Sequence, residues 1–391
     1  MSNVAGLLSR RIAFGLAGAF ALGLCALSPA LADIKIGFQA PLTGPAATDG
    51  KSALTAAQMA VDDINAAGGV LGQKLALVTY DDQAKSDQAI FTANKLIGED
   101  GVKLVVNGSY SASGRAAAPI FQKAGVVMIS AYGVHPDITR AGDYIFRLVH
   151  LGPPQGAAAA LYIGKKLGLK KVSAITMDND YGEATMNGFL AAAPKYGIKI
   201  LNKYSYSLKD RQFGSIVDSV KRDNPDAVYA TGYFFTAGPL VAQLRAAGVT
   251  APIIGSQAFD SEKFIKIAGP AAEGVTIIDS FNRQRDDAAL KAFFKGFEAK
   301  TGYEPEGVAA ITYSAVRLMA DAIKRAGSAD PAKVRDALAE TKDFQTFYGT
   351  LHGFNKLHEI IMPISVNVIK NGKFVPAGEI TDLDAFAPPE K

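Results

Sequence analysis

The turn that follows the apolar segment 102–106 contains the residues best suited to bind a small ligand. It places the hydroxyls of Ser109, Ser111 and Ser113 beside an Ala-rich segment of helical character that begins near Arg115. A strand that ends in such a turn and leads into a helix leaves backbone N–H groups unpaired at the positive end of the helix dipole. Together with the hydroxyls, these groups favour a small anion, most simply a carboxylate. The alternative is that the serines only cap the helix.

Sequence signatures of catalysis and of metal binding are missing. The sequence has no G-x-x-x-x-G-K-[ST] loop, and none of its serines lies in G-x-S-x-G. The four histidines are scattered and do not have H-E-x-x-H spacing. Two acidic pairs, Asp81-Asp82 and Asp178 with Asp180, follow segments of strand character, where carboxylates more often cap helices or bond to backbone than bind metal. We therefore expect no metal, no cofactor and no enzymatic activity.

Length and composition indicate a globular protein of about two domains. The chain has 391 residues, of which 49% are hydrophobic and 20% are charged, which excludes a disordered protein. Lys plus Arg number 41 and Asp plus Glu number 37, and the basic residues form no block. A nucleic acid is therefore not expected as a partner.

The first 32 residues have the pattern of a secretory signal peptide. Arg10 and Arg11 precede an apolar run at 12–27, and Ala30-Leu31-Ala32 has the small-x-small form of a cleavage site. The run is short for a membrane span, and polar sequence follows it at once. The only cysteine, Cys25, lies within this segment, so the mature chain would have no disulfides. We predict cleavage before Asp33 and a location in the periplasm.

Segments of strand and helix character alternate from Asp33 onwards, which predicts parallel sheets in an α/β fold. A second series of alternating segments begins after His150, and the segment 151–154 is the expected crossover between the two series. Strands are expected at 34–38, 75–80, 104–106, 126–130, 172–177, 199–204, 227–231, 253–255 and 275–279, with a hairpin at 365–375. Ligands of such folds bind at the carboxyl ends of the strands.

One unit of the second series repeats the arrangement of the serine turn. The strand at 227–231 leads into Gly232-Tyr233 and then into a helix, so both units read as strand, Gly-containing turn with an aromatic residue, and helix. This weak repeat is consistent with two similar lobes that face each other.

Several motifs carry a family resemblance that covers residues 33 to about 375. They are IKIG at 34–37, PLTGP at 41–45, AVDDIN at 60–65 with Gly68-Gly69, YDD at 80–82, DYGE at 180–183 and ATGY at 230–233. With these motifs the chain resembles the periplasmic branched-chain amino-acid (Leu/Ile/Val) binding proteins of ABC transporters. The resemblance implies a type I periplasmic binding fold: two similar α/β lobes, each with a mostly parallel sheet flanked by helices, joined by three hinge crossings. Lobe 1 would comprise 33–149 and 281–361, and lobe 2 would comprise 150–280 and 362–391.

The resemblance also implies a function and partners. The chain would be the substrate-binding component of an ABC transporter of the branched-chain amino-acid uptake class. It would capture a small carboxylate-bearing ligand by hinge closure and deliver it, as a monomer, to an inner-membrane permease. The same fold also serves ligand-sensing receptor subunits, and the sequence does not separate the two roles.

Seven positions match ligand contacts of the family. Ser111 matches the serine that receives the ligand's carboxylate, Tyr132 matches a backbone contact, and Val134 stands where the family has a threonine. Tyr181 and Tyr233 match two tyrosines that close over the ligand.

The other two positions change the charge expected in the pocket. Gln257 replaces the acid that pairs with the ligand's ammonium, and Asp49 replaces a tyrosine. A neutral amide is a weaker partner for a buried ammonium. Asp49 would restore the missing negative charge from the opposite lobe. Otherwise, the ligand lacks an amine and is an aromatic or aliphatic acid or an amide.

Overall fold

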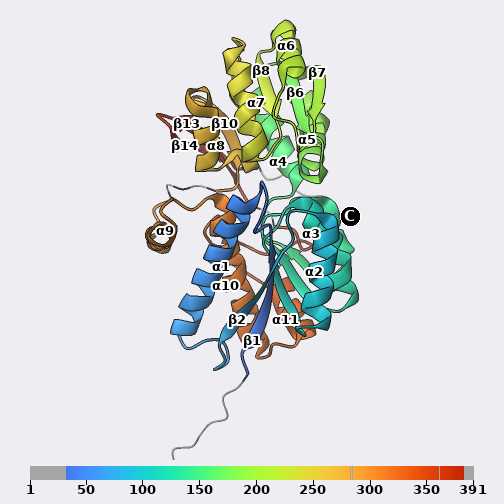
Figure 1. Cartoon of the computed structure of the whole chain (residues 1–391), viewed down its shortest axis with the longest axis vertical. Helices are drawn as coiled ribbons and strands as arrows, with labels where there is room; N and C mark the ends of the chain where they lie inside the picture. The colour runs from blue at the N-terminus through green and yellow to red at the C-terminus, as the bar shows by residue number, and fades with distance from the viewer. Residues whose placement is uncertain (1–31, 282, 284, 361, 383–391) are drawn as a thin grey trace, which may run out of the picture. The chain divides into compact units, whose positions relative to one another are not determined.

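The computed structural model describes residues 32–281, 283, 285–360 and 362–382, and the strands of this part of the chain form two large sheets (Figure 1). The first sheet has five parallel strands in the order β2-β1-β3-β4-β5. Its strands are β1 (Ile34–Ala40), β2 (Leu75–Asp81), β3 (Leu104–Asn107), β4 (Val127–Ser130) and β5 (Ile145–Arg147). Strands β3 and β4 are buried throughout, as expected for apolar strands inside a parallel sheet covered on both faces.

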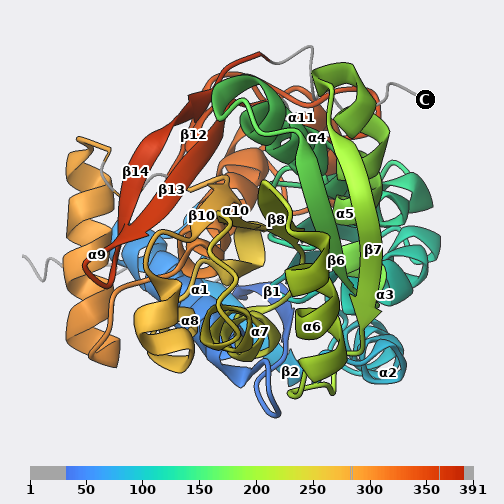
Figure 2. The same ribbon diagram turned by 90° about the horizontal axis from the view of Figure 1, so that it is seen from above.

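The second sheet has seven strands in the order β14-β13-β10-β9-β8-β6-β7, and its last two strands in sequence form an antiparallel edge (Figure 2). Its strands are β6 (Lys171–Met177), β7 (Lys199–Tyr206), β8 (Ala227–Ala230), β9 (Ile253–Gly255), β10 (Thr276–Asp279), β13 (Ile364–Lys370) and β14 (Lys373–Ile380). A small antiparallel pair, β11 (Phe344–Thr346) with β12 (Gly349–Leu351), stands apart from both sheets.

Helices flank each sheet and define two lobes (Figure 1). Lobe 1 is the first sheet with α1 (Ala47–Ala66), α2 (Ser86–Gly98), α3 (Ser111–Lys123), α10 (Gly307–Ala326) and α11 (Pro331–Ala339). Lobe 2 is the second sheet with α4 (Gly152–Leu161), α5 (Asp180–Ala192), α6 (Gly214–Asp223), α7 (Phe234–Ala246) and α8 (Glu262–Ala268). Helix α9 (Ala288–Thr301) follows β10 and contacts α1. The predicted α/β class with mostly parallel, helix-flanked sheets is confirmed.

The chain passes between the two lobes three times. It leaves lobe 1 after β5 and enters lobe 2 with α4, returns to lobe 1 between β10 and α10, and enters lobe 2 again before β13. The exact boundaries at 149/150, 280/281 and 361/362 stay predictions. The predicted signal peptide lies outside the described residues, apart from Ala32.

The structure differs from the sequence prediction at the first of these passes. Residues 151–154 were expected to form a crossover, but α4 already begins at Gly152 with a proline in its first turn, where the missing N–H costs no hydrogen bond. Helix α4 then packs closely against α5. A Cβ added at Gly156 would lie 2.0 Å from the carbonyl oxygen of Thr185, so only glycine permits this approach.

The predicted hairpin at the end of the described chain is confirmed. Strands β13 and β14 pair through the turn Asn371-Gly372, in which φ is 52° and 69°. Positive φ at both positions is typical of the two-residue turns that match the twist of a hairpin, and Asn-Gly is their preferred sequence.

Candidate functional site

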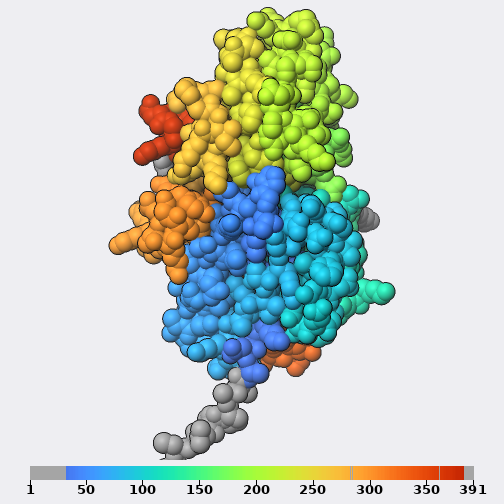
Figure 3. Space-filling view, in the orientation of Figure 1, coloured from blue at the N-terminus to red at the C-terminus, as the bar shows by residue number. Residues whose placement is uncertain are grey.

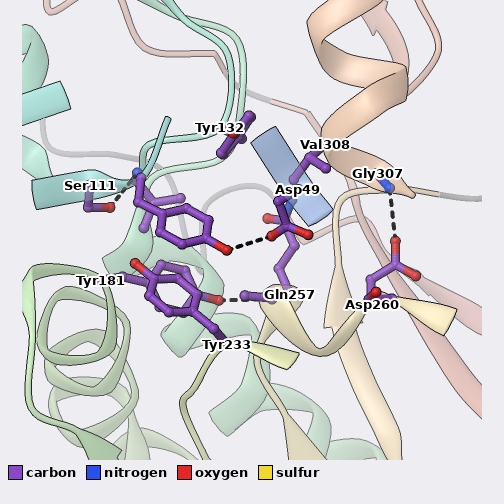
Figure 4. A pocket seen from close by; sticks show the side chains of 13 residues that line it. Asp49, Ser111, Tyr132, Tyr181, Tyr233, Gln257, Asp260, Gly307 and Val308 are labelled. Atoms are coloured by element: carbon purple, nitrogen blue, oxygen red, sulfur yellow. Dashed lines mark hydrogen bonds between the residues drawn. The ribbon is translucent and has the colours of Figure 1, made fainter. Parts of the chain in front are cut away.

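A pocket between the lobes is lined by residues from the carboxyl ends of strands and from the first turns of helices (Figure 4). All seven positions predicted to contact a ligand lie together in its wall. The lining residues are Asp49, Tyr110, Ser111, Tyr132, Val134, Tyr181, Tyr233, Gln257, Ala258, Asp260, Ser261, Gly307 and Val308. The role of the seven in binding stays a prediction.

Ser111 is the first residue of α3 and marks one end of the pocket. Its hydroxyl accepts a hydrogen bond from the backbone N–H of Val134 at 3.0 Å and does not cap the helix. Ser109 and Ser113 are buried but do not line the pocket, so only one of the three serines lies in its wall. The first N–H groups of α3 have no acceptor within the helix, which leaves donors beside a hydroxyl at this end.

Tyr132 and Val134 belong to a short loop after β4 that a buried arginine holds in place. Arg147 donates to the carbonyl oxygens of Gly133 and His135, the latter at 2.7 Å. Its Nε donates to Glu359 at 2.7 Å, so the guanidinium is neutralised within the core. The Tyr132 hydroxyl donates to the carbonyl oxygen of Gly108 and is used within lobe 1. The protein's own hydrogen bonds therefore hold this loop in place.

Three tyrosine rings line up across the pocket. The Tyr233 ring is stacked on Tyr110 with centroids 4.0 Å apart and on Tyr181 with centroids 5.2 Å apart. Tyr110 and Tyr233 each precede the first residue of a helix, α3 in lobe 1 and α7 in lobe 2. Tyr181 lies in the first turn of α5, which begins where the side chain of Asn179 accepts from the backbone N–H of Gly182. The rings thus join the two lobes.

The lobe 2 wall also contains a short turn after β9 in which Gln257 lies. The hydroxyl oxygen of Tyr181 accepts from the N–H of Ala258 at 3.0 Å and fixes this turn. The Gln257 amide has only long contacts, at 3.4 Å, with the hydroxyls of Ser280 and Tyr348. The amide that replaces the family's acid is therefore weakly held within the protein.

Asp49 lies in the first turn of α1, opposite Gln257 (Figure 4). It is buried and accepts a hydrogen bond from the Tyr110 hydroxyl at 2.7 Å. Burial raises the pKa of Asp49 to about 7, and the Tyr110 hydroxyl offsets part of this increase. Glu306 is also buried, and burial together with the charge of Asp49 raises its pKa to about 8. Carboxyl groups with such pKa values are only partly ionised at neutral pH, and a cation that approaches them favours the ionised form.

Two further buried acids share a single arginine behind the pocket. Asp260 pairs with Arg283 at 2.5 Å and accepts from the backbone N–H of Gly307 at 3.2 Å, which links lobe 2 to the start of α10. Burial and the nearby charge of Asp260 raise the pKa of Asp279 well above its usual range. Three buried carboxyl groups, Asp260, Asp279 and Glu306, therefore face the Arg283 guanidinium, and Asp49 interacts with the charges of Asp260 and Lys263. Carboxyl groups thus outnumber cations among the described residues at this end of the pocket.

Polar contacts between the lobes continue to the surface. Arg115 of α3 pairs with Asp180 of α5 at 3.1 Å, and Lys263 of α8 donates to the Thr48 hydroxyl of α1 at 2.6 Å. In the face drawn in Figure 3, blue residues at the start of α1 meet yellow residues of lobe 2. The lobes are in contact around the pocket, which is the arrangement of a closed form.

Within the described part of the chain, no group of three or more His, Cys, Asp or Glu side chains is placed to hold a metal ion. None of the helices in the same part of the chain is both long and apolar enough to cross a membrane.

Comparison with known proteins places this architecture in a family. A family described as periplasmic binding protein matches residues 33–373. The leucine-, isoleucine-, valine-, threonine-, and alanine-binding protein of Pseudomonas aeruginosa is 34% identical over 338 residues, which are 85% of this chain and 89% of that protein. This chain belongs to the periplasmic binding protein family.

Solved structures of family members agree with the fold. A leucine-binding protein from Thermotoga maritima has a TM-score of 0.84 at 27% identity, over 90% of this chain and 99% of that one. A branched-chain amino acid transporter substrate-binding protein from Streptococcus pneumoniae, in complex with isoleucine, has a TM-score of 0.83 at 30% identity, over 89% and 98%. The predicted resemblance to branched-chain amino-acid binding proteins of ABC transporters is confirmed, and with it the type I fold with two lobes.

Sequence reasoning missed six residues that line the pocket, Tyr110, Ala258, Asp260, Ser261, Gly307 and Val308. A signal for Tyr110 was present, because the repeat of strand, turn and helix places it in the same position as Tyr233. Asp260 and Gly307 gave no such signal. Their contact joins residues 47 apart in sequence and on different lobes, and local pattern carries no information about it.

Proposed function

We propose that this chain is the substrate-binding component of an ABC transporter of the branched-chain amino-acid uptake class and captures a small α-amino acid between its lobes. The observation that carries the proposal is the pocket itself, in which the predicted residues of both lobes lie together at strand ends. The names of the relatives in P. aeruginosa and S. pneumoniae support the ligand class. The protein binds its ligand and does not transform it.

The ligand's carboxylate is received at the start of α3. Ser111 offers a hydroxyl there, and the backbone N–H of Val134, which now donates to that hydroxyl, lies beside it. A helix N-terminus adds unpaired N–H groups and a favourable dipole. Val134 has no hydroxyl, so the side-chain contact that the family makes at this position is replaced by backbone.

The ligand's ammonium is received by Asp49 from lobe 1. Gln257 has no charge, whereas Asp49 is a buried carboxyl with one hydrogen bond, in a region with an excess of acid. Arg283 and Lys263 are fewer than the four acids of this region, so an ammonium adds a favourable cation, and a charged hydrogen bond of this kind is stronger than a neutral one. The same excess of acid disfavours the alternative ligands that are anionic, which are aromatic or aliphatic acids without an amine, whereas a neutral amide is distinguished only by the ligand screen.

Closure of the lobes around the ligand is the mechanical step. A ligand held first by lobe 1 is then covered by Tyr181 and Tyr233 of lobe 2, and the population shifts toward the closed form. A monomer in this form presents both lobe surfaces to a permease in the inner membrane. Residues 1–32 direct export to the periplasm as a cleaved signal peptide. Use of the same closure by a sensing receptor is the second candidate function.

A ligand screen tests the proposal. Purified protein is measured by thermal shift and titration calorimetry against aliphatic and polar α-amino acids, with benzoate, acetate and acetamide in parallel. We expect at least one α-amino acid to bind and the amine-free compounds to leave the melting temperature unchanged. Binding of benzoate or acetamide without binding of any amino acid would show that the ligand lacks an amine.

A further inference from the structure

Tyr110 is held by side chains on three sides of the pocket. Its ring lies parallel to Tyr233 of lobe 2, with centroids 4.0 Å apart and planes inclined by 12°. The edge of the ring meets Tyr132 with centroids 6.1 Å apart. Its hydroxyl donates to Asp49 at 2.7 Å. Figure 4 shows Tyr132, Tyr233 and Asp49 on different sides of the pocket, so a residue that touches all three spans it.

This arrangement leaves little room for a ligand's side chain. Two rings 4.0 Å apart are in van der Waals contact, and no atom fits between them. Tyr110 is 6% exposed, and its hydroxyl is bonded to a carboxyl that is itself buried. Moving the ring would therefore break the stack across the lobes and the hydrogen bond from Tyr110 to Asp49.

We propose that Tyr110 determines the size of the ligand by filling the space into which a larger side chain would extend. The inference rests on the proposed function and narrows it. The preferred ligands are small α-amino acids, such as glycine, alanine and serine, whose side chains leave the ring in place. Valine, leucine and phenylalanine must displace the ring and bind more weakly. Forcing extra methylenes into a filled pocket costs binding energy in the same way as overpacking a core.

Titration calorimetry on the wild-type protein gives the first test, because it needs no variant. Glycine, alanine and serine are compared with valine, leucine and phenylalanine. We expect the best small amino acid to bind at least about tenfold more tightly than leucine. If leucine binds as tightly as alanine, the inference is wrong while the proposed function stands. If no amino acid binds, the proposed function fails and this inference fails with it.

A pair of substitutions separates the ring from its hydroxyl. Tyr110→Ala removes both, and Tyr110→Phe removes only the hydroxyl. Tyr110→Ala should bind leucine at least about tenfold more tightly than the wild type does, whereas Tyr110→Phe should keep the wild-type preference for small ligands. An equal change of preference in both variants would contradict a steric role and assign selectivity to the bond with Asp49. Circular dichroism confirms that each variant is folded before titration.

Discussion

Among single residues, we expect the position of the negative charge to set which head group the pocket accepts. Residue 257, where the family has an acid, is a glutamine, and a buried carboxyl lies instead at residue 49, in the first turn of α1. The helix dipole there favours an anion, but burial dominates and raises the pKa to about 7. Asp49 is thus poised to give up its proton when a cationic group approaches.

Replacing Asp49 with Asn should weaken binding of an amine-bearing ligand. Asn keeps an oxygen that accepts from Tyr110, so the packing is retained and only the charge is lost. Hydrogen bonds to charged groups contribute about 1.5–3 kcal/mol, so we expect the dissociation constant to rise roughly tenfold to a hundredfold in calorimetry. Wild-type affinity in the Asp49→Asn variant would show that the ligand's ammonium pairs with a residue other than Asp49.

Affinity should also depend on pH through Asp49. The pKa of the Asp49 carboxyl is raised to about 7, so this group is protonated at lower pH. It must lose its proton before it can form an ion pair with an ammonium. The affinity for an amine-bearing ligand is therefore highest above pH 7 and falls as the pH decreases, by up to about tenfold per pH unit. Titrations between pH 5.5 and 8.5 check this, and the profile of Asp49→Asn should be flatter than that of the wild type. Parallel profiles in the two proteins would exclude Asp49 as the titrating group.

Replacing Ser111 with Ala tests the opposite end of the pocket. The hydroxyl accepts from the Val134 N–H and has no acceptor of its own among the described residues, so its proton is available to a carboxylate. We expect a loss of about 1–3 kcal/mol in binding free energy, measured by calorimetry with the best ligand of the screen. Ser113→Ala is the matched control, since Ser113 is buried nearby but does not line the pocket. Unchanged affinity in Ser111→Ala would contradict the assignment of this residue.

The sequence predicted individual residues where they follow a family motif and missed those that depend on contacts between lobes. Tyr181 and Tyr233 lie in short family motifs, Ser111 lies in the serine turn after β3, and all three line the pocket. Their roles toward a ligand remain predictions. By contrast, the stack of Tyr110 on Tyr233 joins residues 123 positions apart, since 233 minus 110 is 123. No local pattern specifies which of the aromatic side chains meet across the pocket.

Among the elements, the three chain segments that cross between the lobes are linked through hydrogen bonds to one histidine. His150 follows β5, and its ring is buried. Its Nε2 lies 2.8 Å from the carbonyl oxygen of Met362, just before β13, and its Nδ1 lies 2.6 Å from the hydroxyl of Ser280, just after β10. A carbonyl only accepts, so Nε2 carries the proton and Nδ1 accepts from Ser280. All three passes are therefore linked by a neutral ring.

Replacing His150 with Phe should destabilise the fold. The change removes the close partner of the Met362 carbonyl and of the Ser280 hydroxyl, which is left with a 3.4 Å contact to Gln257, at a cost of about 1–3 kcal/mol each in the free energy of unfolding. Urea denaturation measures the loss. His352→Phe is the control, because that side chain is exposed and should change stability by less than about 0.5 kcal/mol. Equal stability of the two variants would show that the ring does not join the passes.

The contribution of His150 should also depend on pH. Burial lowers its pKa to about 4, below the ordinary value of 6.5, so the unfolded chain binds the proton first. The stabilisation from the neutral ring is therefore complete above pH 6.5 and is lost as pH falls toward 4. The difference in unfolding free energy between the wild type and His150→Phe should shrink over this window. Other titrating groups are common to both proteins and cancel in the comparison.

The elements themselves were largely predictable from the sequence, and their ends were not. Buried parallel strands and the Asn371-Gly372 hairpin have local signals, and both were found where expected. The start of α4 was misplaced because Gly152 and Pro153 look like a loop. A proline is compatible with the first turn of a helix, and the close approach of α5 at Gly156 explains why glycine is needed there. Packing between helices decided the outcome.

For the whole molecule, closure depends on contacts between the lobes, both at the pocket wall and at the surface. The Arg115–Asp180 pair is about half exposed on the arginine side, so it contributes little on its own, of the order of 0–1 kcal/mol. The buried stack of Tyr110 on Tyr233 and the hydrogen bond from Gly307 to Asp260 contribute more to the stability of the closed form. If the closed form is only moderately favoured, the observed affinity is lower than that of the closed form itself, in proportion to the fraction of molecules that is closed.

Replacing Arg115 with Ala should therefore weaken binding slightly without any change at the pocket wall. The ion pair joins α3 of lobe 1 to α5 of lobe 2, so its loss shifts the population toward the open form. We expect the dissociation constant to rise by no more than about fivefold, and small-angle scattering to show a larger radius of gyration without ligand but an unchanged one at saturation. Lys171→Ala is the matched control, because its pair with Asp226 has similar exposure but lies within lobe 2. If both variants change affinity and radius equally, the Arg115–Asp180 pair does not stabilise the closed form.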